Sequence, residues 1–291
     1  MKFAAIDIGT NAARLLVGEV CDDEGHHFVK KISYTRVPLR LGDDVFENNK
    51  ISKTKIENTV DSMIAFSKIA GIFKVDQLRA VATSAMREAK NATKVISKVK
   101  EKTGIEIEVI SGQEEADLIF GTFLLLDFDK QKPFIVIDVG GGSTEISVFE
   151  NGYKVAAKSF EIGTIRLLKH KVENHIWIQI TEWIKANVDL NSEHQLYGTG
   201  GNINKIHKIV GLKDKKPVDL KSMKSLHEQL NPLTIEERIE KFHLKPDRAD
   251  VIVPALEIYM HIMNELKSNK ISVPKIGLSD GMIYQMYLNK I

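Results

Sequence analysis

Short apolar runs alternate along this chain with longer segments in which apolar residues recur at helical spacing. Apolar runs bounded by polar residues or glycine are typical of buried strands, and spacings of three and four residues are typical of amphipathic helices. The first half therefore predicts strands at residues 2–8, 13–19, 28–37, 78–83 and 105–110. It predicts helices from about residue 52, over 85–103 and over 113–126.

The second half repeats this order of elements. Strands are expected at residues 134–138, 143–149 and 153–161, and helices at 164–187, 202–210, 220–230, 248–266 and 280–288. Gly104 is expected to cap the helix before it, and Pro254 to lie near a kink. Strand-rich openings followed by strands alternating with helices favour α/β domains with mixed sheets.

A polar segment at residues 127–133 ends in Pro133, which cannot continue a helix. We place the domain boundary there. The prediction is an N-terminal domain at 1–126 and a C-terminal domain at 127–291, since 291 residues suffice for two hydrophobic cores.

Composition narrows the class of protein. The net charge is only +2, so no global field favours nucleic acid or membrane surfaces as partners. A single cysteine, Cys21, excludes an intrachain disulfide and a thiolate metal site. No apolar run approaches the roughly 20 residues that span a bilayer, and the chain starts directly with a strand, so we expect a cytoplasmic protein.

Two glycine loops carry the clearest chemical signal. Each follows an apolar strand that ends in aspartate: Asp7-Ile8-Gly9-Thr10-Asn11 and Asp138-Val139-Gly140-Gly141-Gly142-Ser143-Thr144-Glu145. Glycine allows positive φ and brings backbone N–H groups close to a ligand, and successive N–H groups bind anions. One such turn is ordinary, but two at equivalent points suggest a duplicated scaffold for a polyphosphate ligand.

The paired loops resemble those of the actin, sugar-kinase and Hsp70 superfamily. Within it, the chain resembles the exopolyphosphatase/guanosine pentaphosphate phosphohydrolase family through five segments in the family's order: 7–11, 83–87, 110–116, 138–145 and 278–281. The resemblance implies two ribonuclease-H-like domains flanking a central cleft, in the short two-domain form of the family. It is also compatible with a homodimer.

Glu114 and Glu115 are the candidates for activating water, because they begin a helix directly after Ser111-Gly112. Capping of the helix by these carboxylates is the alternative. The resemblance favours catalysis, because the catalytic glutamate of the family matches Glu115. Arg87 lies at a strand-to-helix junction, where a cation opposes the helix dipole; the resemblance implies that it contacts phosphate.

Asp7 and Asp138 end matching strands, and both could be simple turn residues. Their repetition favours a role in binding Mg²⁺ beside phosphate, with Glu145 as a further acid. Phosphate donors are expected from Gly9, Thr10, Asn11, Gly140, Gly141, Gly142, Ser143 and Thr144, with help from Arg14.

A third glycine loop, Gly198-Thr199-Gly200-Gly201-Asn202, follows a short strand. Gly200 and Gly201 are expected to line the phosphate site, although the loop departs from the hydroxyl-containing form of the family. Lysines follow at 205, 208, 213, 215 and 216. They are either solvated surface or a path that guides a polyanion. Leu278-Ser279-Asp280-Gly281 is expected to cap the final helix through Ser279 or Asp280.

The leading hypothesis is an exopolyphosphatase that releases terminal orthophosphate from inorganic polyphosphate with Mg²⁺ and Glu115. Guanosine pentaphosphate is the alternative substrate. A superfamily kinase and a non-catalytic polyphosphate or alarmone sensor remain open. The sequence contains no H-E-x-x-H, G-x-S-x-G or Walker A motif, which argues against a zinc hydrolase, an acyl-transfer serine and a P-loop NTPase.

Overall fold

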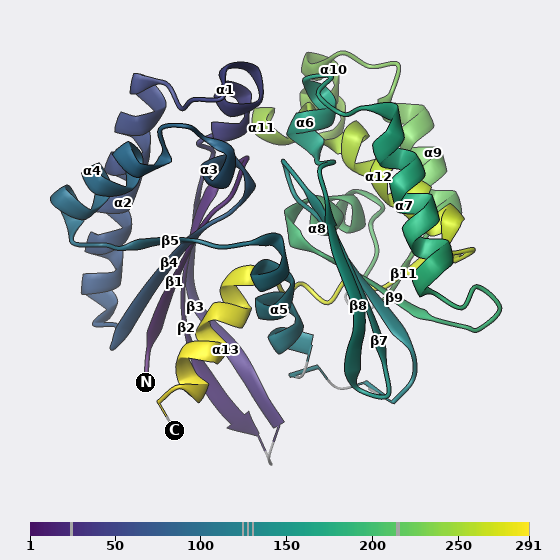
Figure 1. Ribbon diagram of the computed structural model, residues 1–291, viewed down its shortest axis with the longest axis horizontal. Helices are drawn as coiled ribbons and strands as arrows, with labels where there is room; N and C mark the ends of the chain where they lie inside the picture. Colours follow the sequence, from purple (N-terminus) through teal and green to yellow (C-terminus); the bar gives the residue numbers. More distant parts are fainter. Residues whose placement is uncertain (24–25, 124, 127, 130, 214–215, 291) are drawn as a thin grey trace. The chain divides into compact units, whose positions relative to one another are not determined.

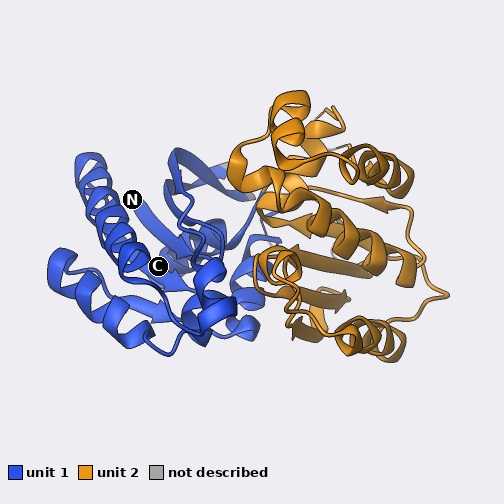
Figure 2. Cartoon of the chain, turned by 90° about the horizontal axis from the view of Figure 1, so that it is seen from above, with its two compact units in different colours: residues 1–127, 276–291 blue, residues 128–275 orange. Residues whose placement is uncertain are grey.

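A computed structural model describes residues 1–23, 26–123, 125–126, 128–129, 131–213 and 216–290. The chain forms two compact units, one from residues 1–127 and 276–291, the other from residues 128–275 (Figure 2). Two residues of the predicted domain linker, Asp127 and Lys130, lie outside the described residues, as does Lys215 of the lysine-rich segment.

The first unit contains a five-stranded mixed sheet in the order β3-β2-β1-β4-β5 (Figure 1). Its strands are β1 (Phe3–Ile8), β2 (Ala13–Asp23), β3 (His26–Val37), β4 (Gln77–Ala82) and β5 (Ile107–Val109). Strand β1 is antiparallel to β2 and parallel to β4. All six residues of β1 are buried, as expected for a strand at the centre of a covered sheet.

Among the described residues, six helices complete the first unit: α1 (Leu41–Asn48), α2 (Lys53–Phe73), α3 (Ser84–Glu88), α4 (Ala92–Thr103), α5 (Gly112–Phe123) and α13 (Leu278–Leu288). Helices α2 and α4 pack together on one side of the sheet, and α13 packs with α5 against β1 and β2 on the other (Figure 1). The side chain of Ser52 caps α2, and Gly104, at φ 72°, ends α4 as the sequence predicts.

The second unit contains a four-stranded mixed sheet in the order β8-β7-β6-β9 and a small antiparallel ribbon. The sheet strands are β6 (Phe134–Val139), β7 (Thr144–Glu150), β8 (Tyr153–Phe160) and β9 (Gln195–Thr199); the ribbon pairs β10 (Val218–Asp219) with β11 (Lys270–Ile271). Strand β6 is antiparallel to β7 and parallel to β9. The order of β6 to β9 thus repeats that of β1 to β4, which confirms the predicted duplication of two mixed α/β sheets.

The helices of the second unit are α6 (Thr164–Leu168), α7 (Asn174–Asn187), α8 (Gly200–Ile209), α9 (Leu220–Leu230), α10 (Ile235–Phe242), α11 (Pro246–Ala249) and α12 (Ile252–Glu265). Helix α12 is the centre of this unit and contacts α6, α7, α8 and α9. Eight of its nine buried residues, all except Pro254, join the apolar side chains of β6, β7 and β9 in one core.

Two long predicted helices are each broken in the structure. The segment 85–103 divides into α3 and α4, because Ala89 is extended and Asn91 uses its amide to bond both backbone groups of Ile51, at 2.9 and 2.8 Å. The segment 164–187 divides into α6 and α7, with His170 in the left-handed region at φ 53°. Helical spacing alone does not reveal such interruptions.

Two further helices differ from the prediction. Helix α1 was not predicted at all. The predicted helix 248–266 is two helices, and Pro254 lies in the first turn of α12 rather than at a kink. The N–H groups of a first turn have no partner within the helix, so proline is tolerated there.

The final helix belongs to the first unit, although the sequence placed it in the C-terminal domain of residues 127–291. Helix α13 contacts α5, β1 and β2. Its buried side chains, which include Met282, Ile283 and Met286, complete the apolar covering of that sheet. The order of elements along the chain does not reveal that the last helix packs against the first sheet.

Candidate functional site

The first glycine loop, residues 7–11, joins β1 to β2. The N–H of Gly9 donates to the carbonyl of Ala12 at 3.0 Å and closes the turn. Thr10 and Asn11 are buried. Gly9 does not have the positive φ that the sequence argument assumed; a β-carbon there would instead lie 3.3 Å from the Ala12 carbonyl oxygen. Glycine therefore serves the compactness of this turn.

Asp7 and Arg14 are direct partners across the first hairpin. They face each other in the register of β1 and β2, and the guanidinium of Arg14 forms an ion pair with the Asp7 carboxylate. The Asp7 side chain is 4% exposed and that of Arg14 is 25% exposed. The buried Asp7 carboxylate is therefore paired with a cation of the protein itself, Arg14.

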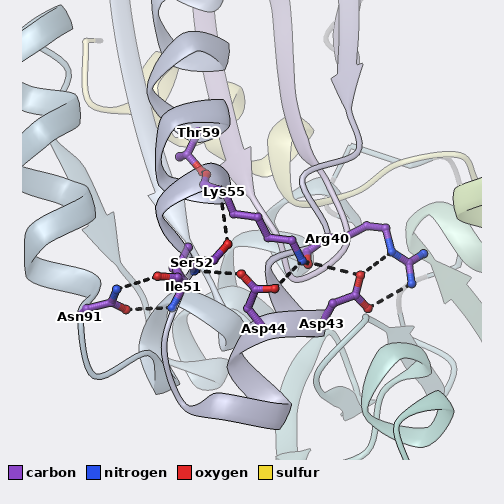
Figure 3. A network of polar contacts seen from close by, with 8 residues as sticks. All are labelled: Arg40, Asp43, Asp44, Ile51, Ser52, Lys55, Thr59 and Asn91. Atoms are coloured by element: carbon purple, nitrogen blue, oxygen red, sulfur yellow. Dashed lines mark hydrogen bonds and ion pairs between the residues drawn. The ribbon is translucent and has the colours of Figure 1, made fainter.

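A polar network supports the segment that holds the first loop (Figure 3). The N–H of Arg40 donates to the carbonyl of Asn11 at 2.9 Å. Arg40 has a left-handed backbone, and its guanidinium binds the Asp43 carboxylate at 2.7 and 3.1 Å. Lys55 lies 3.0 Å from the Asp44 carboxylate and donates to the Arg40 carbonyl. Sequence reasoning missed this network because its members share no local motif.

Three chain segments of the first unit meet at one edge of its sheet. Strands β1, β4 and β5 are parallel, so their carboxyl ends lie at the same edge. The N–H of Thr83 bonds the carbonyl of Ile8 at 3.2 Å, and that of Ile110 bonds the carbonyl of Ala82 at 3.0 Å. The first glycine loop, the start of α3 and the start of α5 are thereby brought to one edge.

Arg87 links α3 to the turn before α5. Its Nη1 donates to the carbonyl of Ile110 at 2.7 Å. The residue lies in the last turn of α3, where a cation complements the helix dipole, and not at a helix N-terminus as the sequence argument supposed. The Arg87 guanidinium is thus held beside the turn that leads to Glu115.

The two acids at the start of α5 have different surroundings. Ser111 and Glu114 form a capping box: the Ser111 N–H donates to Glu114 at 2.8 Å and the Glu114 N–H donates to the Ser111 hydroxyl at 3.1 Å. Hydrogen bonds from Ser111 lower the pKa of the exposed Glu114 carboxyl. Glu115 is half-buried, with its Oε2 inaccessible to solvent. The capping contacts therefore fall to Glu114.

The second glycine loop joins β6 to β7 in the second unit. The N–H of Gly140 donates to the carbonyl of Ser143 at 2.9 Å, as Gly9 does in the first loop. Thr144 is fully buried and its hydroxyl donates to the carbonyl of Ile162 at 2.6 Å. That hydroxyl therefore serves the fold, and it is not placed to act as the phosphate donor expected from the sequence.

The start of α6 holds the second loop from behind. The N–H of Thr164 donates to the Gly140 carbonyl at 3.0 Å, and that of Ile165 to the Gly141 carbonyl at 2.8 Å. Arg166 is buried, and its Nε donates to the carbonyl of Gly142 at 2.8 Å. The carbonyl groups of Gly140, Gly141 and Gly142 thus all accept hydrogen bonds from residues 164–166. Sequence reasoning missed Arg166, because its contact with Gly142 joins positions 24 residues apart and no local motif indicates it.

Asp138 and Glu145 face each other in the register of β6 and β7. Glu145 is buried, and its Oε1 accepts from the hydroxyl of Ser159 at 2.6 Å. Side chains of register partners lie on one face of a sheet. Two carboxylates on one face fit Mg²⁺, which commonly takes one or two protein carboxylates together with phosphate and water. Asp7 fits a metal less well because it is paired with Arg14.

No group of three or more His, Cys, Asp or Glu side chains that could enclose a metal occurs among the described residues.

The third glycine loop lies beside Asp138. Strands β6 and β9 are parallel with Asp138 opposite Thr199, so the second and third loops share one edge of this sheet. Gly200 has φ 85°, and a β-carbon there would overlap the Asp138 carboxylate. Tyr259, fully buried, donates to the Thr199 carbonyl at 3.2 Å; burial, followed by the charge of Asp138, raises its pKa well above the ordinary value.

Several cations lie along α8. Arg248 donates to Asn202 at 2.9 Å, and Asn202 donates to the Val139 carbonyl at 2.8 Å, next to the second loop. Burial lowers the pKa of Lys205, and the charges of Lys208, Arg248 and Lys245 lower it further. Two lysines of the lysine-rich segment, Lys205 and Lys208, thus belong to a cluster that includes Arg248, which no sequence motif indicated.

In the described part of the chain, no helix has both the length and the apolar character needed to cross a membrane.

The chain matches the model of the Ppx/GppA phosphatase family over residues 20–290. It is 30% identical to the bifunctional 3-dehydroquinate synthase/phosphatase of Fusobacterium nucleatum, over 99% of this chain but only 47% of that relative. It is 24% identical to exopolyphosphatase 1 of Mycobacterium tuberculosis, over 97% of this chain and 87% of the relative. The chain thus spans about half the length of the first of these relatives.

Solved structures show the same fold. An exopolyphosphatase from Cytophaga hutchinsonii superposes with a TM-score of 0.85 at 23% identity, covering 99% of this chain and 98% of that one. The Aquifex aeolicus member of the Ppx/GppA family gives a TM-score of 0.77 at 24% identity, covering 100% and 98%. The family model matches nearly the whole chain, and the paired glycine loops and the fold agree with that match. This protein therefore belongs to the Ppx/GppA phosphatase family.

Proposed function

We propose that the protein is an exopolyphosphatase that hydrolyses the terminal phosphoanhydride bond of inorganic polyphosphate, with Glu115 as the general base. One observation carries the proposal: the edge of the first sheet gathers the first glycine loop, Arg87 and the start of α5. Glu114 makes the capping contacts of that helix, and we assign the role of general base to the adjacent Glu115.

The proposed step is an in-line displacement. The Glu115 carboxylate accepts a proton from water as the water oxygen forms a bond to the terminal phosphorus. The bond from that phosphorus to the bridging oxygen breaks, and the electron pair stays on the shortened chain. Orthophosphate leaves, and Glu115 returns its proton to solvent.

Charge that develops on the phosphoryl oxygens requires donors. Backbone N–H groups of the first loop and the guanidinium of Arg87 are the proposed donors in the first unit. In the second unit we assign phosphate binding to Gly141, Gly142 and Ser143. The carbonyls of Gly141 and Gly142 are held by α6, which favours presentation of the loop's N–H groups to an anion.

Asp138 and Glu145 would hold Mg²⁺, and Asp7 would orient the guanidinium of Arg14 toward phosphate. When bound, Mg²⁺ would neutralise charge on the phosphate oxygens.

Polyphosphate is preferred as substrate for two reasons. The mycobacterial relative is an exopolyphosphatase. The cations around α8, including Lys205, Lys208 and Arg248, would also suit an extended polyanion. Guanosine pentaphosphate presents the same terminal phosphate and is the alternative substrate.

The test is orthophosphate release from long-chain polyphosphate and from guanosine pentaphosphate, with Mg²⁺ and with excess EDTA. The proposal predicts release from polyphosphate without nucleotide and its loss in EDTA. Faster release from guanosine pentaphosphate would reassign the substrate. Formation of ATP from ADP would indicate a kinase, and tight binding of polyphosphate without product would indicate a sensor.

A further inference from the structure

The segment Leu278-Ser279-Asp280-Gly281 begins α13 and anchors that helix firmly in the first unit. Asp280 is buried, and its carboxylate accepts from the N–H of Gly277 at 3.1 Å, which caps the helix. The other carboxylate oxygen lies 2.9 Å from Nζ of Lys31 on β3. The first turn of α13 is therefore tied to β3 of the sheet.

Gly281, in this same turn, is where α13 meets α5. A β-carbon at Gly281 would lie 2.6 Å from the carbonyl carbon of Leu118 and closer still to its oxygen. The obstructing atoms are backbone, so no side-chain rotation relieves the overlap. By contrast, a β-carbon at Gly121, also on α5, would have nothing within 4 Å. Glycine is therefore required at position 281, whereas a larger residue would fit at position 121.

Leu118 lies three residues after Glu115, so it stands about one turn from the proposed base on the same helix. The α5 face around it is buried through Ala116, Ile119 and Phe123. Ahead of Glu115, the capping box and the bond from Arg87 to Ile110 fix the start of α5. The helix is therefore held at its N-terminal end by these bonds and along its length by Gly281.

We propose that Gly281 is a positioning residue for Glu115: the absence of a side chain on α13 sets the depth at which α5 packs, and thereby the location of the Glu115 carboxylate. This inference rests on the proposed function. A methyl group at position 281 must push Leu118 away by on the order of an ångström, and a displacement of that size in a catalytic group can lower turnover about 100-fold.

The experiment compares Gly281→Ala with Gly121→Ala, each alone and combined with Glu115→Gln, in orthophosphate release from polyphosphate. We expect Gly281→Ala to lower kcat about 100-fold with KM within about twofold of wild type, because the base and not substrate binding is displaced. Gly121→Ala should keep the wild-type kcat. In the Glu115→Gln background, Gly281→Ala should have no further effect, since the group that it positions is already absent.

A wild-type kcat in Gly281→Ala, or an equal fall in both backgrounds, would overturn the inference. A wild-type chain that releases no orthophosphate would overturn the proposed function, and the inference with it. If Gly281→Ala is unfolded at the assay temperature, the double substitution Lys31→Met, Asp280→Asn removes the anchor of α13 without adding volume. It should lower kcat with KM unchanged, and an unaltered kcat in that variant would overturn the inference as well.

Discussion

Gly163 is the position where a single methyl group should disturb the second glycine loop most. It precedes α6 with φ −152°, an extended conformation open to any residue, so alanine would meet no backbone strain there. Space is the obstacle: a β-carbon would lie 2.5 Å from the Gly141 carbonyl carbon and from the Gly142 nitrogen, against the 3.4 Å at which ordinary contact begins.

The magnitude follows from that overlap. The loop must move by roughly an ångström, and overpacking of this kind lowers the free energy of unfolding by about 1–3 kcal/mol. The movement also stretches the four hydrogen bonds that residues 164–166 donate to the carbonyls of residues 140–142. We therefore expect Gly163→Ala to lower kcat/KM for polyphosphate about 100-fold, since the loop is the proposed phosphate ligand.

The assay pairs urea unfolding with orthophosphate release. Gly71→Ala on α2 is the matched control, because a β-carbon there has nothing within 4 Å; it should raise the free energy of unfolding by about 0.5–1 kcal/mol and leave kcat/KM unchanged. If Gly163→Ala had wild-type stability and wild-type kcat/KM, the claim that α6 holds the second loop would be refuted.

Two further predictions concern the first unit. Asn91→Ala should lower the free energy of unfolding by about 1–3 kcal/mol, because two backbone groups of Ile51 lose their partners; exposed Asn58→Ala is the control, and equal stability of the two variants would contradict the role of Asn91. Burial would raise the pKa of Asp44, but hydrogen bonds from Ser52 and the charge of Lys55 outweigh it, so the pKa lies below 3.8. A carboxylate whose pKa is lower in the folded state stabilises the fold at pH values above the unfolded-state pKa. This stabilisation is lost as the pH falls through the folded-state pKa. The stability difference between wild type and Asp44→Asn should therefore be fully present above the ordinary value of 3.8 and shrink as the pH falls below it; a difference that stays constant in urea unfolding would contradict this.

The fold class could be predicted because its signals are local. The first and second glycine loops each follow an apolar strand whose aspartate lies beside the turn. The strands and helices near these loops follow from apolar residues spaced at two positions in strands and at three to four positions in helices. The duplication of β1–β4 in β6–β9 followed from those loops. The capping box of Ser111 and Glu114 was also readable, since serine three positions before glutamate is its sequence pattern.

Contacts between distant segments could not be predicted in this way. The pairing of Asn91 with Ile51, which breaks a long helix, spans 40 positions, and that of Lys31 with Asp280 spans 249. The same holds for Arg166, which bonds Gly142, 24 positions away, and for Arg248, which bonds Asn202, 46 positions away. Gly281 shows the limit most clearly: its role depends on the carbonyl of Leu118, and nothing near it in the chain indicates that neighbour.

The most direct test of the account compares Glu115→Gln with Glu114→Gln in orthophosphate release from saturating polyphosphate with Mg²⁺. The two residues are adjacent, and only one of them caps α5. We predict that Glu115→Gln lowers kcat by about 10²–10⁴-fold, the range for loss of a general base, while Glu114→Gln stays within a few-fold of wild type. Undiminished release by Glu115→Gln, or an equal loss in both variants, would contradict the assignment of Glu115 as the base.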